Sequence, residues 1–177
     1  MGLDIVRAQM SGASVLAVTT YQFSVFIHIT AVMVGFGATF AEAIMFPVAM
    51  KVSPRHLPYV HRLQLAINQW LVTPALVIVL GTGIYQVSKG NWGFGKFWVS
   101  AAFVIVFIIG GLLGGYFIPT DRRLAPMAER DIAASGDGEV VLSDDYQRQA
   151  RLEGIVGTIT GILLVAAVYL MVTKPGA

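Results

Sequence analysis

The sequence predicts an all-α, polytopic membrane protein: a four-transmembrane-helix bundle with both termini outside. Hydrophobic residues make up 56% of its 177 residues and charged residues only 12%, whereas about a quarter of the residues in a soluble domain are charged. The mean hydropathy is +0.72. Four long apolar stretches divide the chain, and one bundle is as much as this length supports. We therefore treat residues 1–177 as a single membrane domain.

Each apolar stretch is long enough to cross a bilayer, because a transmembrane helix needs about 20 mostly apolar residues. The first stretch, between Arg7 and Lys51, is too long for one crossing. Residues 1–21 are therefore predicted to form an interfacial or extended N-terminal segment. The predicted spans are about 23–46, 66–88, 97–118 and 154–173.

The distribution of Lys and Arg predicts the orientation. Eight of these residues lie in the connections 51–65 and 119–153, and four lie on the opposite side. Cytoplasmic loops carry the excess of Lys and Arg, so 119–153 is predicted to be a cytoplasmic loop of a protein in the bacterial inner (plasma) membrane. Within it, 124–134 and 144–153 are predicted to extend the third and fourth helices. The lipid bilayer is the implied partner, and a net charge of +2 gives no case for a nucleic acid.

Glycines spaced four residues apart predict sites of close helix packing. The alternatives are contact inside the bundle, an interface with a second copy or a membrane-complex partner, and a glycine face for a flat cofactor. The glycines concerned are Gly110 with Gly114, Gly111 with Gly115, and Gly157 with Gly161.

His28 and Glu42 are the candidate functional residues of the first span, because an ionisable side chain inside a span is costly and usually faces the protein interior. They are 14 residues apart, which puts both on one stripe of the helix but about 21 Å apart along its axis. They are therefore predicted to belong to two polar layers at different membrane depths, and not to one catalytic pair.

His28 belongs to the outer layer, where Lys96 opens the third span. One interpretation is that His28 ligates a metal ion or a haem iron, with haem b as the candidate cofactor, since a neutral imidazole coordinates metals near pH 7. The other is an interior histidine that hydrogen-bonds to a carbonyl or to a hydroxyl such as that of Ser24 or Thr30. Within one chain, the second axial ligand would be Lys96, a methionine or nothing.

Glu42 belongs to the inner layer, level with Asn68 and within reach of His61 and Arg62. It is either a proton relay or cation site, or a carboxyl that is neutralised or paired with Arg62 to hold the helices in register. The spacing of His61 from His56 is poor for metal ligands, which favours an interfacial role for both. The chain has no cysteine, which excludes thiolate metal sites and cysteine nucleophiles.

Three segments carry a resemblance to a known family: Phe-Ile-His-Ile-Thr-Ala-Val (26–32), Gly-Lys-Phe-Trp-Val-Ser-Ala (95–101) and Val-Tyr-Leu-Met-Val-Thr-Lys-Pro-Gly (168–176). Over nearly its whole length the chain resembles a family of four-helix bacterial integral membrane proteins of unknown function. More distantly it is similar to the membrane protoporphyrinogen oxidases and the copper-resistance D proteins. In the oxidases a first-span histidine and a third-span lysine are associated with haem, and the resemblance implies that role for His28 and Lys96.

Two functions of different classes follow from these residues. The first is a haem-associated or redox-linked membrane protein that uses His28, with Lys96 nearby. The alternative is a non-catalytic accessory or assembly subunit of a membrane complex, in which the glycine ridges and polar layers serve packing. An ion permease is disfavoured, because four helices offer no obvious continuous path. No motif decides whether the protein is an enzyme.

Overall fold

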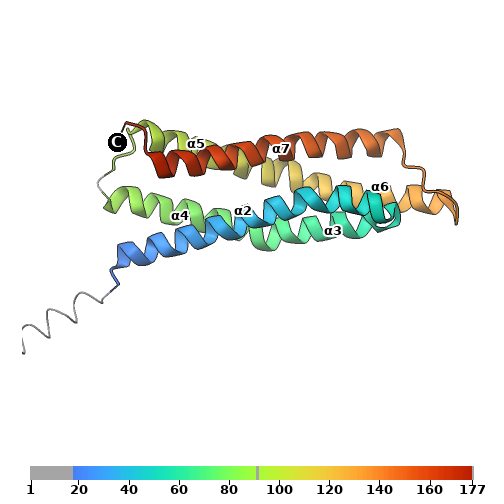
Figure 1. Ribbon diagram of the computed structural model, residues 1–177, viewed down its shortest axis with the longest axis horizontal. Helices are drawn as coiled ribbons and strands as arrows, with labels where there is room; N and C mark the ends of the chain where they lie inside the picture. The colour runs from blue at the N-terminus through green and yellow to red at the C-terminus, as the bar shows by residue number, and fades with distance from the viewer. Residues whose placement is uncertain (1–17, 91, 177) are drawn as a thin grey trace, which may run out of the picture.

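The computed structural model describes residues 18–90 and 92–176, and within them the chain forms a bundle of four long antiparallel helical segments (Figure 1). All four are long and apolar enough to cross a membrane. This confirms the predicted all-α, four-helix architecture. Most of the predicted N-terminal segment, residues 1–17, lies outside the described residues. The elements are α2 (Thr20–Val52), the short turn η1 (Pro54–His56), α3 (Leu57–Ile67), η2 (Asn68–Val72), α4 (Thr73–Lys89), α5 (Phe97–Leu112), η3 (Leu113–Phe117), α6 (Ile118–Ser135) and α7 (Asp144–Thr173).

Local sequence signals fix where the first and last helices begin. The side chain of Thr19 accepts a hydrogen bond from the backbone N–H of Gln22, and the side chain of Gln22 accepts one from the backbone N–H of Thr19. This capping box satisfies two N–H groups that the first turn of α2 leaves free. The side chain of Ser143 caps α7 by accepting a hydrogen bond from the backbone N–H of Tyr146. The two ends of the bundle are therefore set by polar residues outside the apolar spans.

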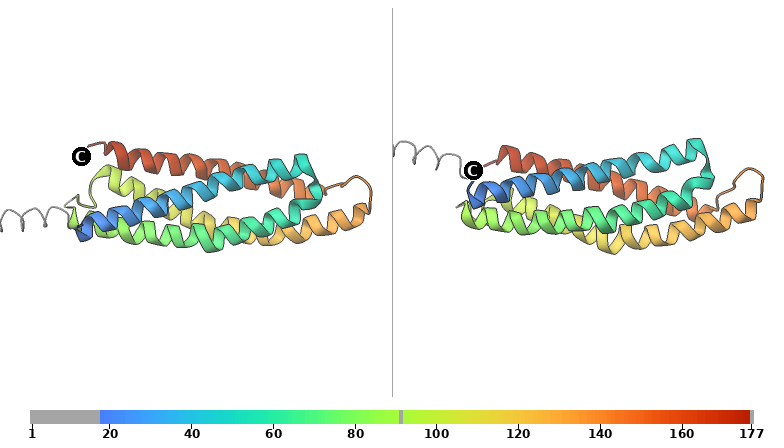
Figure 2. Two further views of the ribbon diagram at one scale, coloured as in Figure 1. Left: turned by 60° about the horizontal axis from the view of Figure 1, so that its bottom comes forward. Right: turned by 90° about the horizontal axis from the view of Figure 1, so that it is seen from below.

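The helices run well past the predicted spans at one end of the bundle. There α2 meets α3, and α6 meets α7 (Figure 2). We call this the basic end, because it carries the two connections rich in Lys and Arg; the opposite end, where α2 and α5 start, is the terminal end. The predicted extensions 124–134 and 144–153 are confirmed, because they lie within α6 and α7.

Two π-helical turns interrupt the middle helices. In η2 and η3 the backbone hydrogen bonds span five residues, and in each case a proline, Pro74 or Pro119, follows near the start of the next helix. Proline has no N–H and its ring crowds the carbonyl four residues earlier, so a locally wider turn relieves both problems. The carbonyl of Asn68 accepts both the backbone N–H of Thr73 and, at 2.7 Å, its Oγ1 hydroxyl. These turns lie at the level of the site described below.

The buried core of the basic end lies beyond the predicted spans. It joins α2 and α3 to α6 and α7 around the fully buried Tyr146, Leu57 and Leu124. In contrast, large hydrophobic side chains such as Phe107 and Trp70 are exposed on the outside of the bundle. An outer surface of this kind fits hydrocarbon better than water. The molecule therefore combines four lipid-facing spans with a conventional packed core at the basic end.

Candidate functional site

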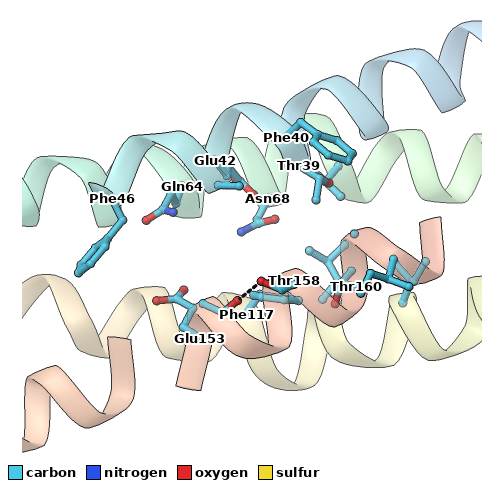
Figure 3. A pocket seen from close by; sticks show the side chains of 18 of the residues that line it. Thr39, Phe40, Glu42, Phe46, Gln64, Asn68, Phe117, Glu153, Thr158 and Thr160 are labelled. Atoms are coloured by element: carbon cyan, nitrogen blue, oxygen red, sulfur yellow. Dashed lines mark hydrogen bonds between the residues drawn. The ribbon is translucent and has the colours of Figure 1, made fainter. Parts of the chain in front are cut away.

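A cavity of about 910 Å³ lies between α2 and α7 and extends to both π-helical turns. We call it the chamber (Figure 3). Most of its lining is apolar, but at the basic end five polar side chains border it. They come from four different segments of the chain: Glu42, Gln64, Asn68, Asp121 and Glu153. Figure 3 shows Glu42, Gln64 and Asn68 on one side and Glu153 on the other.

The opposite part of the chamber reaches the outer surface of the bundle. Four large apolar side chains that line it, Phe40, Ile162, Val165 and Tyr169, are also exposed. Ile162, Val165 and Tyr169 belong to the predicted fourth span, so we expect this mouth to lie at the level of the hydrocarbon and to face lipid.

The α7 wall of the chamber is formed in part by glycines. Gly157 and Gly161 line it, and a Cβ added at either position would meet no atom within 4 Å. These two glycines therefore do not contact another helix, which differs from the packing expected of them inside the bundle. Their missing side chains instead leave the chamber wide.

The glycines of the third span are divided between packing and surface. A Cβ at Gly110 would lie 3.2 Å from Leu76 Cδ2, so Gly110 lets α5 approach α4 closely. The other three, Gly111, Gly114 and Gly115, have no such neighbour and are exposed. Contact inside the bundle therefore accounts for Gly110 alone.

Several buried oxygen atoms at the polar end of the chamber lack a hydrogen-bond donor. Asn68 Nδ2 donates to Asp121 Oδ2 at 3.1 Å. Asp121 Oδ1, Glu42 Oε1 and Gln64 Oε1 have no partner in the part of the chain that the structure describes. Buried polar atoms are nearly always hydrogen-bonded, and leaving one unpaired costs about 1–3 kcal/mol. The chamber therefore presents acceptors to whatever occupies it.

His61 lies behind this polar end and is completely buried. Its Nε2 and the hydroxyl of Tyr146 are 2.8 Å apart, while its Nδ1 has no partner among the described residues. One ring nitrogen of His61 and one oxygen each of Asp121 and Glu153 lie within 4.8 Å of one another. The three side chains thus converge from α3, α6 and α7.

The structure brings together the residues predicted for the inner layer. Glu42 and Asn68 border the same chamber. His61 does not border it but lies next to Asp121, which does. The alternative in which Glu42 pairs with Arg62 is wrong, since Arg62 is exposed and its guanidinium pairs with Glu129.

Sequence reasoning missed Asp121 and Glu153, which it assigned to the 119–153 loop. Both lie within one turn of a predicted span, Asp121 after the third and Glu153 before the fourth. Because α6 and α7 continue without interruption past these points, both carboxyls face into the bundle. The helical extensions predicted for the loop were the signal that could have placed them there.

The outer layer at the terminal end has a different construction. His28 Nδ1 lies 2.8 Å from Thr82 Oγ1, and Gln86 Nε2 donates to the carbonyl of Ser24 at 3.2 Å. Lys96 is exposed and its Nζ donates to the carbonyl of Gly176 at 3.4 Å. The residues proposed as haem ligands thus hydrogen-bond to different partners, and neither borders the chamber.

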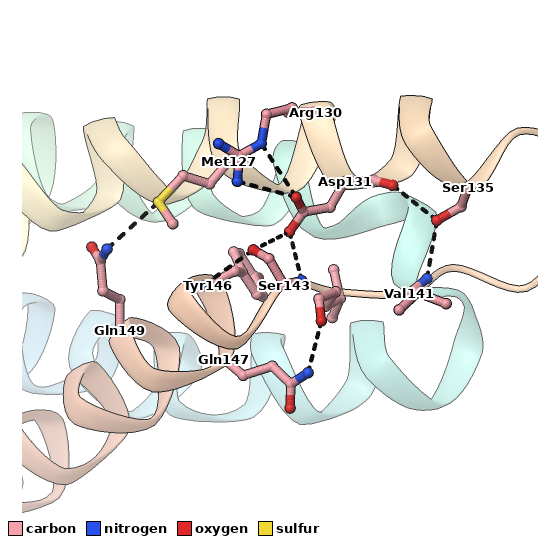
Figure 4. A network of polar contacts seen from close by, with 10 residues as sticks. Met127, Arg130, Asp131, Ser135, Val141, Ser143, Tyr146, Gln147 and Gln149 are labelled. Carbon is pink, nitrogen blue, oxygen red and sulfur yellow. Dashed lines mark hydrogen bonds and ion pairs between the residues drawn. The ribbon is translucent and has the colours of Figure 1, made fainter.

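A separate network fastens the loop at the basic end (Figure 4). Asp131 Oδ2 accepts hydrogen bonds from Ser143 N at 2.9 Å and Ser143 Oγ at 2.7 Å, and Arg130 pairs with Oδ1. Burial alone raises the pKa of the Asp131 carboxyl, but the hydrogen bonds from Ser143 and the nearby Arg130 outweigh it and hold the pKa below its usual value. The ionised carboxylate ties the end of α6 to the start of α7, beyond the predicted spans.

Four membrane-length helices, with large apolar side chains on their outer surface, define a multi-pass integral membrane protein. The chain belongs to the predicted integral membrane protein family DUF2269, whose model matches residues 22–175. No curated protein and no solved structure matches the chain. The expected resemblance to membrane proteins of unknown function is therefore confirmed. The more distant similarity to the protoporphyrinogen oxidases and copper-resistance D proteins is not shown, so the roles that it implies for His28 and Lys96 stay predictions.

Proposed function

We propose that this protein is a redox-linked membrane protein that binds a quinol, the reduced form of an isoprenoid quinone, in the chamber. The observation that carries the proposal is the difference between the two ends of the chamber. One end opens on the apolar surface of α7, and the other end has buried hydrogen-bond acceptors without a partner among the described residues. An isoprenoid tail matches the mouth, and a ring with two hydroxyl groups supplies the missing donors. A volume of about 910 Å³ is within the range of cavities that hold small molecules and cofactors.

Different residues of the chamber contact different parts of the quinol ring. Glu42 Oε1 and Gln64 Oε1 accept from the hydroxyl groups, because neither atom has a donor within the described chain. Gly157 and Gly161 leave a smooth wall on α7 against which a flat ring can lie. The tail then follows the apolar residues toward the lipid. Binding from within the membrane needs no opening of the packed core at the basic end.

Glu42→Leu should weaken quinol binding by on the order of tenfold or more, because it removes a buried acceptor that hydrogen-bonds to the ring. The measurement is saturable binding of a short-chain ubiquinol, kept anaerobic, to the full chain in phosphatidylcholine nanodiscs. Glu42→Gln retains a side-chain oxygen and should bind more like the parent.

The matched control is Glu129→Leu, the same change at an exposed carboxylate that pairs with Arg62 outside the chamber. It should bind ubiquinol as the parent does. Ubiquinol binding that never saturates would mean that lipid fills the chamber. If Glu42→Leu and Glu129→Leu lost ubiquinol binding equally, Glu42 would not be a residue that contacts the ring. Either result contradicts the proposal.

Haem binding at His28 is the second candidate, and one observation favours it. The contact between Nδ1 and Thr82 Oγ1 orients the imidazole and leaves Nε2 as the ligating atom. If haem binds there, the purified protein shows a Soret band that is lost or altered in His28→Ala, and Lys96→Met tests the second ligand. A colourless parent that takes up no added haemin would exclude this candidate and leave the quinol proposal untouched.

A further inference from the structure

We propose that His61, Asp121 and Glu153 form a binding site for one divalent transition-metal ion at the basic end of the chamber. The site goes beyond the proposed quinol binding and does not depend on it. It draws its three ligands from α3, α6 and α7, so an ion bound there would join three of the four helical segments.

The separation of the ligand atoms fits a single ion. One nitrogen of His61 and one oxygen from each carboxyl lie within 4.8 Å of one another. Ligand atoms at about 2.0–2.2 Å from a tetrahedral ion are about 3.4 Å apart. Side-chain movements of about an ångström would therefore close the site around an ion.

Burial distinguishes this group from an ordinary cluster of acidic residues. His61 is 0% exposed and Asp121 only 1%, and each has an unpartnered atom, Nδ1 of His61 and Oδ1 of Asp121. The described residues that line the chamber include a third carboxyl, Glu42, and no Lys or Arg. Buried carboxylates need a cation or a proton, and within residues 18–90 and 92–176 no lysine or arginine side chain lines the chamber.

Two further side chains hold the ligands in place. Tyr146 OH lies 2.8 Å from His61 Nε2, and Asn68 Nδ2 donates to Asp121 Oδ2 at 3.1 Å. Metal-binding histidines and carboxylates are usually oriented by a hydrogen bond to the atom that does not bind the metal. Here Tyr146 and Asn68 each contact one atom of these side chains, and the other atoms, His61 Nδ1 and Asp121 Oδ1, have no partner among the described residues.

The donor set selects the class of ion. One imidazole nitrogen with two carboxylates suits Zn²⁺, Mn²⁺ and Fe²⁺, whereas Mg²⁺ and Ca²⁺ prefer oxygen ligands alone. A water molecule completes the coordination of the ion, because open positions on such ions are commonly filled by water. We therefore expect a nitrogen- and oxygen-ligated ion of the Zn²⁺ type.

The test is metal binding by the full chain in detergent, with no quinol added. The parent should retain about one Zn²⁺ per chain after dialysis, and should show visible absorption bands with Co²⁺ in its place. Asp121→Asn and Glu153→Gln, which keep the side-chain volume, and His61→Asn should each weaken Zn²⁺ binding at least tenfold. Zn²⁺ should also raise the Tm of the parent by several degrees and that of Asp121→Asn by much less.

Two controls carry the same chemical changes outside the site. His56→Asn alters an exposed histidine in η1, and Asp145→Asn alters an exposed aspartate of α7 that pairs with Arg148. Both should bind Zn²⁺ as the parent does. A parent that retains no ion would overturn the proposal, and so would losses shared equally by the controls. The Co²⁺ bands and the Zn²⁺-dependent Tm keep the test decisive if one variant is merely less stable. Quinol binding is measured separately, and neither result decides the other.

Discussion

Gly161→Phe should abolish quinol binding, with a loss of at least a hundredfold, while the bundle still folds. Gly161 lines the chamber, and a side chain added there would begin in empty space, since no atom lies within 4 Å of its Cβ. A phenyl ring therefore fills the chamber where the quinol ring lies, without displacing a neighbouring helix. The measurements are ubiquinol binding in nanodiscs and thermal unfolding in detergent.

Gly111→Phe provides the matched control for this change. Gly111 is also helical and open at its Cβ, but it is exposed and does not line the chamber. The variant should bind ubiquinol normally. If Gly161→Phe binds as well as Gly111→Phe, then the ligand does not occupy the chamber and the proposed function is wrong.

Tyr146→Ala should be the most destabilising substitution at the basic end. Tyr146 is fully buried in the core around Leu57 and Leu124, and its hydroxyl is the partner of His61 Nε2. Removing a buried aromatic side chain costs about 3–5 kcal/mol, so we expect the Tm to fall by roughly 10 °C for a chain of this size. Thermal unfolding followed by circular dichroism measures the change.

Two variants separate the ring from the hydroxyl. Tyr146→Phe keeps the packing and loses only the hydrogen bond, so its cost should be on the order of 1–2 kcal/mol. Tyr59→Ala alters an exposed tyrosine of the neighbouring α3 and should leave the Tm nearly unchanged. A Tyr146→Ala protein as stable as Tyr59→Ala would show that the basic end is not the packed core described above.

The helices were predictable because apolar length and charge placement are properties of the sequence alone. Four stretches near 20 residues or longer specify four spans, and the same reasoning placed Glu42 level with Asn68. The position of a partner on another helix depends on how the helices rotate and slide against each other. A hydroxyl was one of the partners expected for His28, yet the contact is with Thr82 on α4 and not with Ser24 or Thr30.

The chamber was not predictable for a related reason. A ridge of glycines has the same sequence signature whether a helix packs against it or a cavity lies beside it. Gly110 on α5 packs closely against α4 and Gly161 on α7 does not pack, and the paths of the helices beside each glycine decide between these outcomes. Asp121 and Glu153 were missed because a polar residue just beyond a span is usually solvated, whereas here the helices continue and keep both residues inside the bundle.

The π-helical turn η2 (Asn68–Val72) has a consequence for the angular phase of its helix. A π-helical turn holds one residue more than an α-helical turn, and one residue corresponds to about 100° of rotation in an α-helix. Asn68, at the polar end of the chamber, begins this turn, and Thr82, beside His28, follows it in the same helical segment. Regular α-helical winding of the same residues would rotate one contact about 100° away while the other stayed in place. The wider turn therefore sets the phase that lets a single helix serve both polar layers, and inserting a further residue here should be far more harmful than inserting one in the 136–143 loop.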